Sequence, residues 1–277
     1  MPLSTAGQKV KEGLTGTIRG AGDVVEETVK TTREITVGTL RSAGDVVKET
    51  SVVTSDTIMG AVQAANEVGT GVGQVVKGSV IGLIRGIGEV TTVTAGVITD
   101  TVRAALRGGS EIGGDMGSVT RNAAAGVIAS TKDIGLSVQD AAFSLARGLI
   151  LGANDVGRDL ATTAKSAVQG SIRGSEEIGG DALRAIRNTA RGLVQGTAEV
   201  GGDVGAVTRG AVEGAIEAAR EVGLKAEDAA TAAATGALRG AQEVGESAVN
   251  AVTGILETTV SGVKVVAETP FKKDEKV

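Results

Sequence analysis

The chain of 277 residues contains no histidine, cysteine, tryptophan or tyrosine, and its two aromatic residues are Phe143 and Phe271. These absences remove the commonest general base, the thiolate nucleophile and most soft or borderline metal ligands. They also exclude a disulfide framework and leave the redox compartment open. We therefore expect a protein that is not an enzyme and that takes no metal, cofactor or small-molecule substrate.

Large side chains are scarce, because the apolar residues are mostly valine, alanine and isoleucine. Each small side chain buries little area, at roughly 25 cal/mol per Å². A conventional core is therefore not expected, and stability should come from many equivalent contacts. The net charge is −5, with acids and bases interleaved, so no basic patch for nucleic acid is present.

Proline and long hydrophobic runs are also nearly missing. The two prolines, Pro2 and Pro270, lie at the ends of the chain, which fits an uninterrupted helical element between them. Uncharged stretches are much shorter than the roughly 20 residues that span a bilayer. The first residues have no apolar segment of the kind found in secretory signals. We expect a cytoplasmic protein, at a lipid surface or in an assembly, without a signal peptide or transmembrane segment.

The chain instead contains a repeat of 22 residues, which occurs eleven times without insertion or deletion over residues 16–257. The third position of the unit is always a branched aliphatic residue, the eighth is acidic and the ninth is Val or Ile. Residues 1–15 form a lead-in, 258–269 a degenerate half repeat and 270–277 a charged tail. The units open at Gly16, Gly38, Gly60, Gly82, Ala104, Gly126, Gly148, Gly170, Gly192, Gly214 and Gly236.

The period predicts an all-α fold, since eleven residues make three turns at about 3.67 residues per turn. On such a wheel the third and ninth positions fall on one apolar arc and the charged residues on the opposite arc. We predict a very long, nearly continuous amphipathic helix, packed side by side with others in an assembly. The apolar-face contacts are Ile18, Leu40, Ile84, Leu106, Ile150, Ile172, Ile216, Leu238, Val24, Val46, Val90, Ile112, Ile178, Val200 and Val244.

Two other architectures stay open. The helix could turn back as hairpins at Gly-Gly-Asp, at residues 113–115, 179–181 and 201–203, where Gly would end one helix and Asp would cap the next. The early units, rich in Val, Thr and Ile, would also suit a β-solenoid with one coil per unit. The Ala-rich later units favour the helix.

Glycine is abundant, with 43 residues, and each costs about 1 kcal/mol relative to alanine inside a helix. An isolated helix should therefore be mostly unfolded unless a lipid surface or close helical neighbours compensate. Several units place glycine at positions 1 and 5, and such Gly-x-x-x-Gly spacing lets helix backbones approach closely. The predicted helix-packing residues are Gly16, Gly20, Gly82, Gly86, Gly148, Gly152, Gly170, Gly174, Gly192, Gly196, Gly236 and Gly240.

Charged residues four apart on the polar face predict ion pairs within the helix, each worth a few tenths of a kcal/mol. In six units an arginine at position 4 precedes the acid at position 8. The predicted intrahelical pairs include Arg19 with Asp23, Arg85 with Glu89, Arg173 with Glu177, and Arg239 with Glu243.

The Val/Thr/Gly-rich stretches, such as 60–78 and 91–101, resemble the 11-residue arrays of perilipins, and the period is similar to that of synucleins and exchangeable apolipoproteins. The resemblance implies a chain that is disordered in solution and becomes helical on lipid. This chain differs in its Arg/Glu polar face and its stronger Gly-x-x-x-Gly pattern.

We expect a non-catalytic structural protein whose helices pack laterally through small residues into a layer, tube or filament, with the apolar face on lipid or on a second layer. Its partners would be further copies of itself and a lipid surface. A reversible lipid-droplet or membrane coat is one alternative, and a desiccation-protective protein is another.

Overall fold

The computed structural model describes residues 3–18, 23–43, 46–256 and 258–267, and within this part the chain forms twelve helices and one short hairpin. The helices are α1 (Thr5–Thr17), α2 (Val24–Ser42), α3 (Val46–Val68), α4 (Val72–Val90), α5 (Ala95–Glu111), α6 (Met116–Ile134), α7 (Val138–Asp155), α8 (Leu160–Glu177), α9 (Ala182–Glu199), α10 (Val204–Val222), α11 (Ala226–Val244) and α12 (Glu246–Thr253). The strands β1 (Thr259–Val260) and β2 (Val263–Lys264) pair antiparallel.

Glycine at position 10 ends most of these helices. In units three and five to ten this glycine adopts a left-handed backbone with φ between +64° and +76°, at Gly69, Gly113, Gly135, Gly157, Gly179, Gly201 and Gly223, whereas unit four has Thr91 at this position and Gly245 of unit eleven has φ +138°. The next amide then bonds back to a carbonyl of the last turn, as Gly114 N does to Gly109 O at 2.8 Å. Because L side chains rarely adopt this conformation, position 10 is where glycine is required.

After five of these glycines an oxygen-bearing side chain two residues later caps the next helix, whereas Gly71 and Lys225 stand at this place without a side-chain cap bond. Asp159 accepts a hydrogen bond from the Thr162 amide at 2.6 Å, and Asp181 accepts one from the Arg184 amide at 3.0 Å. Such caps satisfy amides that have no partner inside the helix. Each 22-residue unit from α5 onward therefore supplies one helix and one turn.

These turns confirm the all-α class and correct the prediction of one nearly continuous helix. The described residues contain no β-solenoid coil, and the three Gly-Gly-Asp sequences do form turns. The same turn also forms where a different residue separates position 10 from position 12, as in Gly157-Arg158-Asp159. The 3.67-residue wheel still places the apolar arc correctly, because the helical periodicity holds within each helix. The turns interrupt only the continuity of the helix along the chain.

The first helices break elsewhere in the unit. Units one and two have Val25 and Val47 at position 10, and α2 begins instead after Asp23 at position 8, whose carboxylate accepts from the Glu26 amide. The turn moves to its later place in the unit after α3. This helix is 23 residues long, whereas α4 to α11 have 17 to 19 residues. The sequence repeat thus continues without interruption while the position of the turn moves by about one helical turn.

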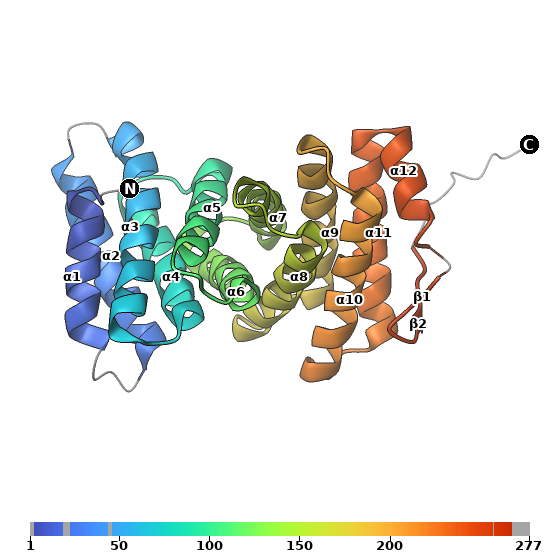
Figure 1. Cartoon of the computed structure of the whole chain (residues 1–277), viewed down its shortest axis with the longest axis horizontal. Helices are drawn as coiled ribbons and strands as arrows, with labels where there is room; N and C mark the ends of the chain where they lie inside the picture. Colours follow the sequence, from blue (N-terminus) through green and yellow to red (C-terminus); the bar gives the residue numbers. More distant parts are fainter. Residues whose placement is uncertain (1–2, 19–22, 44–45, 257, 268–277) are drawn as a thin grey trace, which may run out of the picture.

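Helices two apart in the chain lie side by side. The odd-numbered helices α1 to α11 form one row, the odd row, and α2 to α10 form the even row (Figure 1). Contacts between the helices of a row are more extensive than those between consecutive helices, which join the two rows. The helices stand upright at both ends of Figure 1, whereas α7 is seen nearly end-on, so the helix axes rotate along the molecule.

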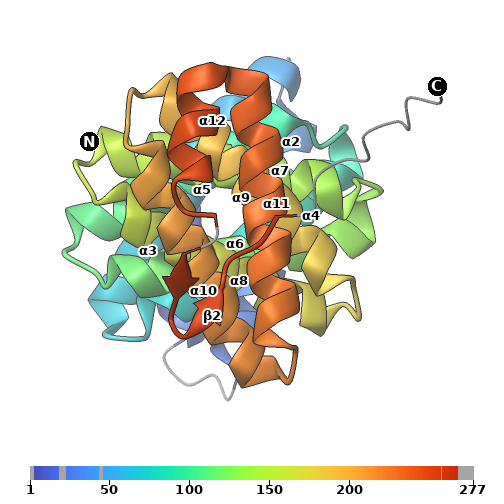
Figure 2. The same cartoon turned by 90° about the vertical axis from the view of Figure 1, so that its right-hand side faces the viewer.

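The C-terminal end of the stack is covered by different elements. Figure 2 shows α12 beside α11 at this end, with the hairpin next to them. Val260, Val263 and Val265 are buried, and Arg220 of α10 donates a hydrogen bond to the Ser261 carbonyl at 2.9 Å. The degenerate half repeat is therefore a hairpin that closes the stack, and not a further helix; the predicted tail 270–277 lies outside the described residues.

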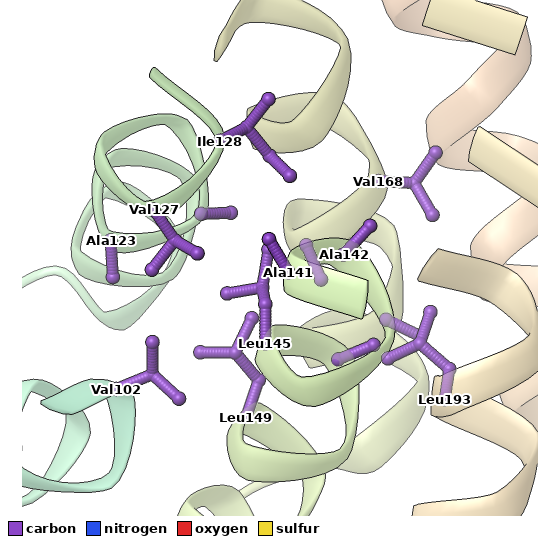
Figure 3. Packing of buried hydrophobic residues seen from close by; sticks show 14 of the residues in the cluster. Val102, Ala123, Val127, Ile128, Ala141, Ala142, Leu145, Leu149, Val168 and Leu193 are labelled. Atoms are coloured by element: carbon purple, nitrogen blue, oxygen red, sulfur yellow. The ribbon is translucent and has the colours of Figure 1, made fainter. Parts of the chain in front are cut away.

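A continuous apolar interior runs between the rows, contrary to the expectation that a conventional core is absent. One cluster of buried residues extends from Ala6 to Val265 and includes side chains from most helices. Figure 3 shows part of it, where Leu145 and Leu149 of α7 lie between Val127 of α6 and Leu193 of α9. Small residues bring the helices close enough for valine and leucine to fill the remaining space. No helix in the described part of the chain is both long and apolar enough to cross a bilayer.

Candidate functional site

The recurring feature of the molecule is the contact between a helix and the helix two before it, and glycine makes it possible. A Cβ added to Gly174 on α8 would lie 2.7 Å from the Ala125 carbonyl oxygen and 2.9 Å from the Ile128 Cβ, both on α6. Real Cβ atoms do not approach backbone this closely, so only hydrogen fits at this position. The glycine therefore sets the distance between the two backbones.

Ten of the twelve glycines predicted to pack helices meet a neighbouring helix in this way. They are Gly82, Gly86, Gly148, Gly152, Gly170, Gly174, Gly192, Gly196, Gly236 and Gly240. Gly16 has nothing within 4 Å of an added Cβ, and Gly20 lies outside the described residues. The close packing is thus found, but between helices of one chain.

The row helices run parallel, as the spacing of these contacts shows. Gly236 meets Arg187 and Gly240 meets Arg191, so both contacts join residues 49 apart and advance in the same direction. In the even row Gly170 meets Arg121 with the same spacing. The same glycine contact therefore recurs along each row every 44 residues, which is two sequence repeats.

The predicted apolar face divides into two groups. The third-position residues are all buried, with exposures of 0–9%: Ile18, Leu40, Ile84, Leu106, Ile150, Ile172, Ile216 and Leu238. The ninth-position residues lie at helix ends and are half-buried: Val24, Val46, Val90, Ile112, Ile178 and Val200. Val244, also at the ninth position, is 44% exposed. The third position is the core position of the unit, and the ninth is a partly buried position at the helix ends.

The ion pairs join different helices, which corrects the prediction of pairs within one helix. Arg85 binds Asp133 of α6 at 2.7 Å, and Glu89 binds Arg33 of α2. The hydrogen bond from Arg33 lowers the pKa of Glu89 below its ordinary value. A neighbouring parallel helix therefore offers these charges a partner that competes with the residue four positions away.

The other predicted pairs follow the same rule. Arg173 binds Glu221 at 2.7 Å, Glu177 binds Lys77 at 2.6 Å, and Glu243 binds Arg191 at 2.6 Å. Asp23 caps α2, Arg239 forms no ion pair with a described residue, and Arg19 is outside the described part.

In the odd row these pairs form a regular ladder. Arg103 binds Asp155 at 2.6 Å and Arg147 binds Glu199 at 2.7 Å, and both pairs join residues 52 apart. The Arg191–Glu243 pair has the same separation. The side chains are about 34–42% exposed, so each pair stabilises little, about 0–1 kcal/mol, and serves mainly to fix how neighbouring helices align.

A 44-residue period in the sequence also indicates these two rows, in addition to the 22-residue repeat. Position 18 is basic in the first, third, fifth, seventh and ninth units, at Arg33, Lys77, Arg121, Lys165 and Arg209. In the alternate units the same position holds Ser55, Thr99, Phe143, Arg187 and Thr231. Because the residue type at position 18 alternates, adjacent units are expected to have different neighbours. This is the case in a structure in which successive helices belong to two different rows.

A groove of about 540 Å³ crosses the even row over α6, α8 and α10. Its cationic side chains are Arg121, Lys165 and Arg209, one from each helix, and its acids are Glu213 and Glu217. Lys165 binds Glu217 at 2.6 Å, and the Gln169 amide donates to the same carboxylate at 3.0 Å. An adjoining pocket of about 350 Å³ shares Gly117, Thr162 and Ser166 with this groove. Sequence reasoning did not find this site.

Comparison with protein-family models and with curated proteins found no match. Among the described residues there is also no group of acids that could hold a metal ion. The arguments for function therefore rest on the repeated helix contacts and on the surface that they produce.

Proposed function

We propose that the protein is a non-catalytic structural scaffold that folds by itself. Its amphipathic helices pack laterally through glycine, and the apolar face of each row rests on the other row of the same chain. The two helical layers that the sequence predicts for an assembly of several copies would then be the two rows of a single chain. The observation that carries this proposal is the burial of the third-position aliphatic residues, such as Ile84 and Ile172, inside the stack of one chain.

The lipid coat is the second candidate, supported by the resemblance in period and composition. In the folded state its apolar arc is not available, since the exposed large apolar side chains of the described residues are Val52, Val244 and Val266. A coat would require the rows to open so that the third-position side chains enter lipid instead. A location in the cytoplasm and association with further copies are proposals of the same kind.

Circular dichroism and light scattering after size exclusion, with and without anionic vesicles, separate the two candidates. The scaffold predicts a helical, monodisperse chain in buffer that unfolds cooperatively and changes little when vesicles are added. A coil in buffer that becomes helical only on vesicles would overturn the scaffold and support the coat. Large helical oligomers in buffer would instead favour the filament.

A pair of variants tests whether the buried face carries the fold. Ile84→Asp together with Ile172→Asp should abolish the helical signal in buffer, because both side chains are fully buried and an uncompensated charge is costly there. Gln74→Asp, on the exposed face of α4, should leave it unchanged. Retained helicity in the double variant would mean that the third position is not the core.

A further inference from the structure

We infer that the groove over α6, α8 and α10 binds an extended acidic peptide segment of a partner protein, anchored by Arg121 and Arg209. The inference rests on the proposed scaffold, because the groove exists only when the even row is assembled. It goes further by assigning the row a binding surface and a class of partner.

The two anchoring cations have no partner within the described chain. Arg121 is half-buried on α6 and Arg209 is exposed on α10, and neither forms an ion pair or side-chain hydrogen bond with a described residue. The other basic residues at position 18 of the even row are used: Arg33 binds Glu89, Lys77 binds Glu177 and Lys165 binds Glu217. The sequence thus supplies two cations at this surface that the fold itself does not use.

The charges between these anchors are largely neutralised. Lys165 and Gln169 both hold Glu217, which leaves Glu213 as the acid of the groove without an ion-pair partner in the described part. Two cations without partners against one such acid give the groove a local excess of positive charge, although the whole chain carries −5. An anionic ligand is therefore attracted to this groove more than to the chain as a whole.

The spacing of the anchors selects an extended ligand. Arg121 and Arg209 lie on helices separated by α8, and packed helix axes are about 8–10 Å apart, so two steps make roughly 16–20 Å. A ligand long enough to reach from α6 to α10 suits this arrangement better than a single phosphate or carboxylate. An extended peptide rises about 3.3 Å per residue, so about six residues reach from one arginine to the other.

The lining between the anchors suits a peptide backbone. Ala161, Ala206 and Gly210 contribute no bulky side chain, and Thr162 and Ser166 offer hydroxyl groups that can bond backbone amides and carbonyls. A nucleic acid would present a continuous polyanion to a protein of net negative charge, which disfavours it relative to a short acidic segment.

The test measures fluorescence anisotropy of a labelled octapeptide of alternating Glu and Thr, with the alternating Gln and Thr peptide as the probe control. We expect binding of the Glu peptide alone, weakening as salt is raised. Arg121→Gln with Arg209→Gln should lower its affinity about tenfold or more, since each lost charge-assisted bond contributes on that scale. Lys132→Gln, which removes an exposed cation of α6 outside the groove, should not change it.

Glu213→Gln gives a readout of opposite sign. Removing this acid should strengthen binding of the Glu peptide several-fold, which a merely structural role for the groove would not produce. The melting temperature of each variant, followed by circular dichroism, confirms that the even row is intact.

Four results would overturn the inference. Equal binding by the double variant, or no binding by the folded wild-type chain, would show that the groove does not bind the peptide. Neither result would contradict the scaffold. Tighter binding of inorganic phosphate or of a single-stranded oligonucleotide through the same arginines would replace the peptide with another ligand class. A chain that is coil in buffer would instead show that the scaffold itself is wrong.

Discussion

Glycine has two separate roles in this protein, and they are distinguished by position in the unit. At positions 1 and 5 the missing side chain allows contact between backbones, as where Gly174 meets Ala125. At position 10 the missing side chain allows a left-handed turn, as at Gly179 with φ +65°. The helix propensity lost at each glycine is offset in the first case by packing along a whole row.

Alanine substitutions separate close packing from helix propensity. Gly174→Ala should destabilise the fold by about 1–3 kcal/mol, because the added methyl group would overlap the Ala125 carbonyl and force the two helices apart. Gly38→Ala is the matched control, since an added Cβ there meets nothing within 4 Å, and it should stabilise the fold by up to about 1 kcal/mol. Urea unfolding followed by circular dichroism measures both, and equal effects would contradict the packing role.

At the scale of the element, the turn is favoured by two residues of most units. Position 10 is usually a glycine that ends one helix, and position 12 is usually a side chain that caps the next; the exceptions are Thr91 at position 10 and Gly71 and Lys225 at position 12. The sequence predicts this turn only where Gly-Gly-Asp is complete, because the middle glycine looks like part of the pattern. Leu136 and Arg158 occupy that middle place without changing the turn, so glycine and the cap two residues later are sufficient.

The cap of α8 makes a prediction about pH. The bonds that Asp159 accepts from Thr162 lower the pKa of the carboxyl group in the folded state. A depressed folded-state pKa stabilises the fold above the unfolded value, near 3.9, and this contribution is lost as the pH falls through the folded-state pKa. Asp159→Ala should therefore cost about 1 kcal/mol at neutral pH and progressively less as the pH falls below about 4.

A gain-of-stability variant provides the control. Lys225 stands at the start of α11 in an extended conformation and makes no side-chain cap bond. Lys225→Asn should supply that bond and raise stability by about 0.5–1 kcal/mol. Unfolding curves at neutral and acid pH test both variants, and a pH-independent cost for Asp159→Ala would refute the cap.

At the scale of the whole molecule, much of the local structure could be predicted from the sequence, whereas the arrangement of the helices could not. Helical composition, the buried third position and the glycine faces follow from patterns within one unit. Such patterns are satisfied equally by a neighbour from the same chain or from another copy, so they do not distinguish a stack from a filament. The distinguishing signal is the 44-residue alternation of position 18, as in Lys165 against Phe143.

The groove could not be predicted for a related reason. Arg121 and Arg209 are 88 positions apart in the sequence and look like ordinary members of a charged helix face. They share one groove only because α6, α8 and α10 lie side by side. Whether their charges have partners is a property of the assembled row and not of any one helix.

The measurement that tests the central claim most directly is the distance between spin labels at Arg147→Cys and Glu199→Cys, which is clean because the chain has no native cysteine. These side chains meet at 2.7 Å across α7 and α9, and the axes of packed helices are about 8–10 Å apart. The two-row stack predicts a short, narrow distance distribution for the doubly labelled chain in buffer, diluted with unlabelled protein. One continuous helix would separate the same positions by roughly 78 Å, at 1.5 Å per residue, and that result, or a broad distribution typical of a coil, would contradict the account.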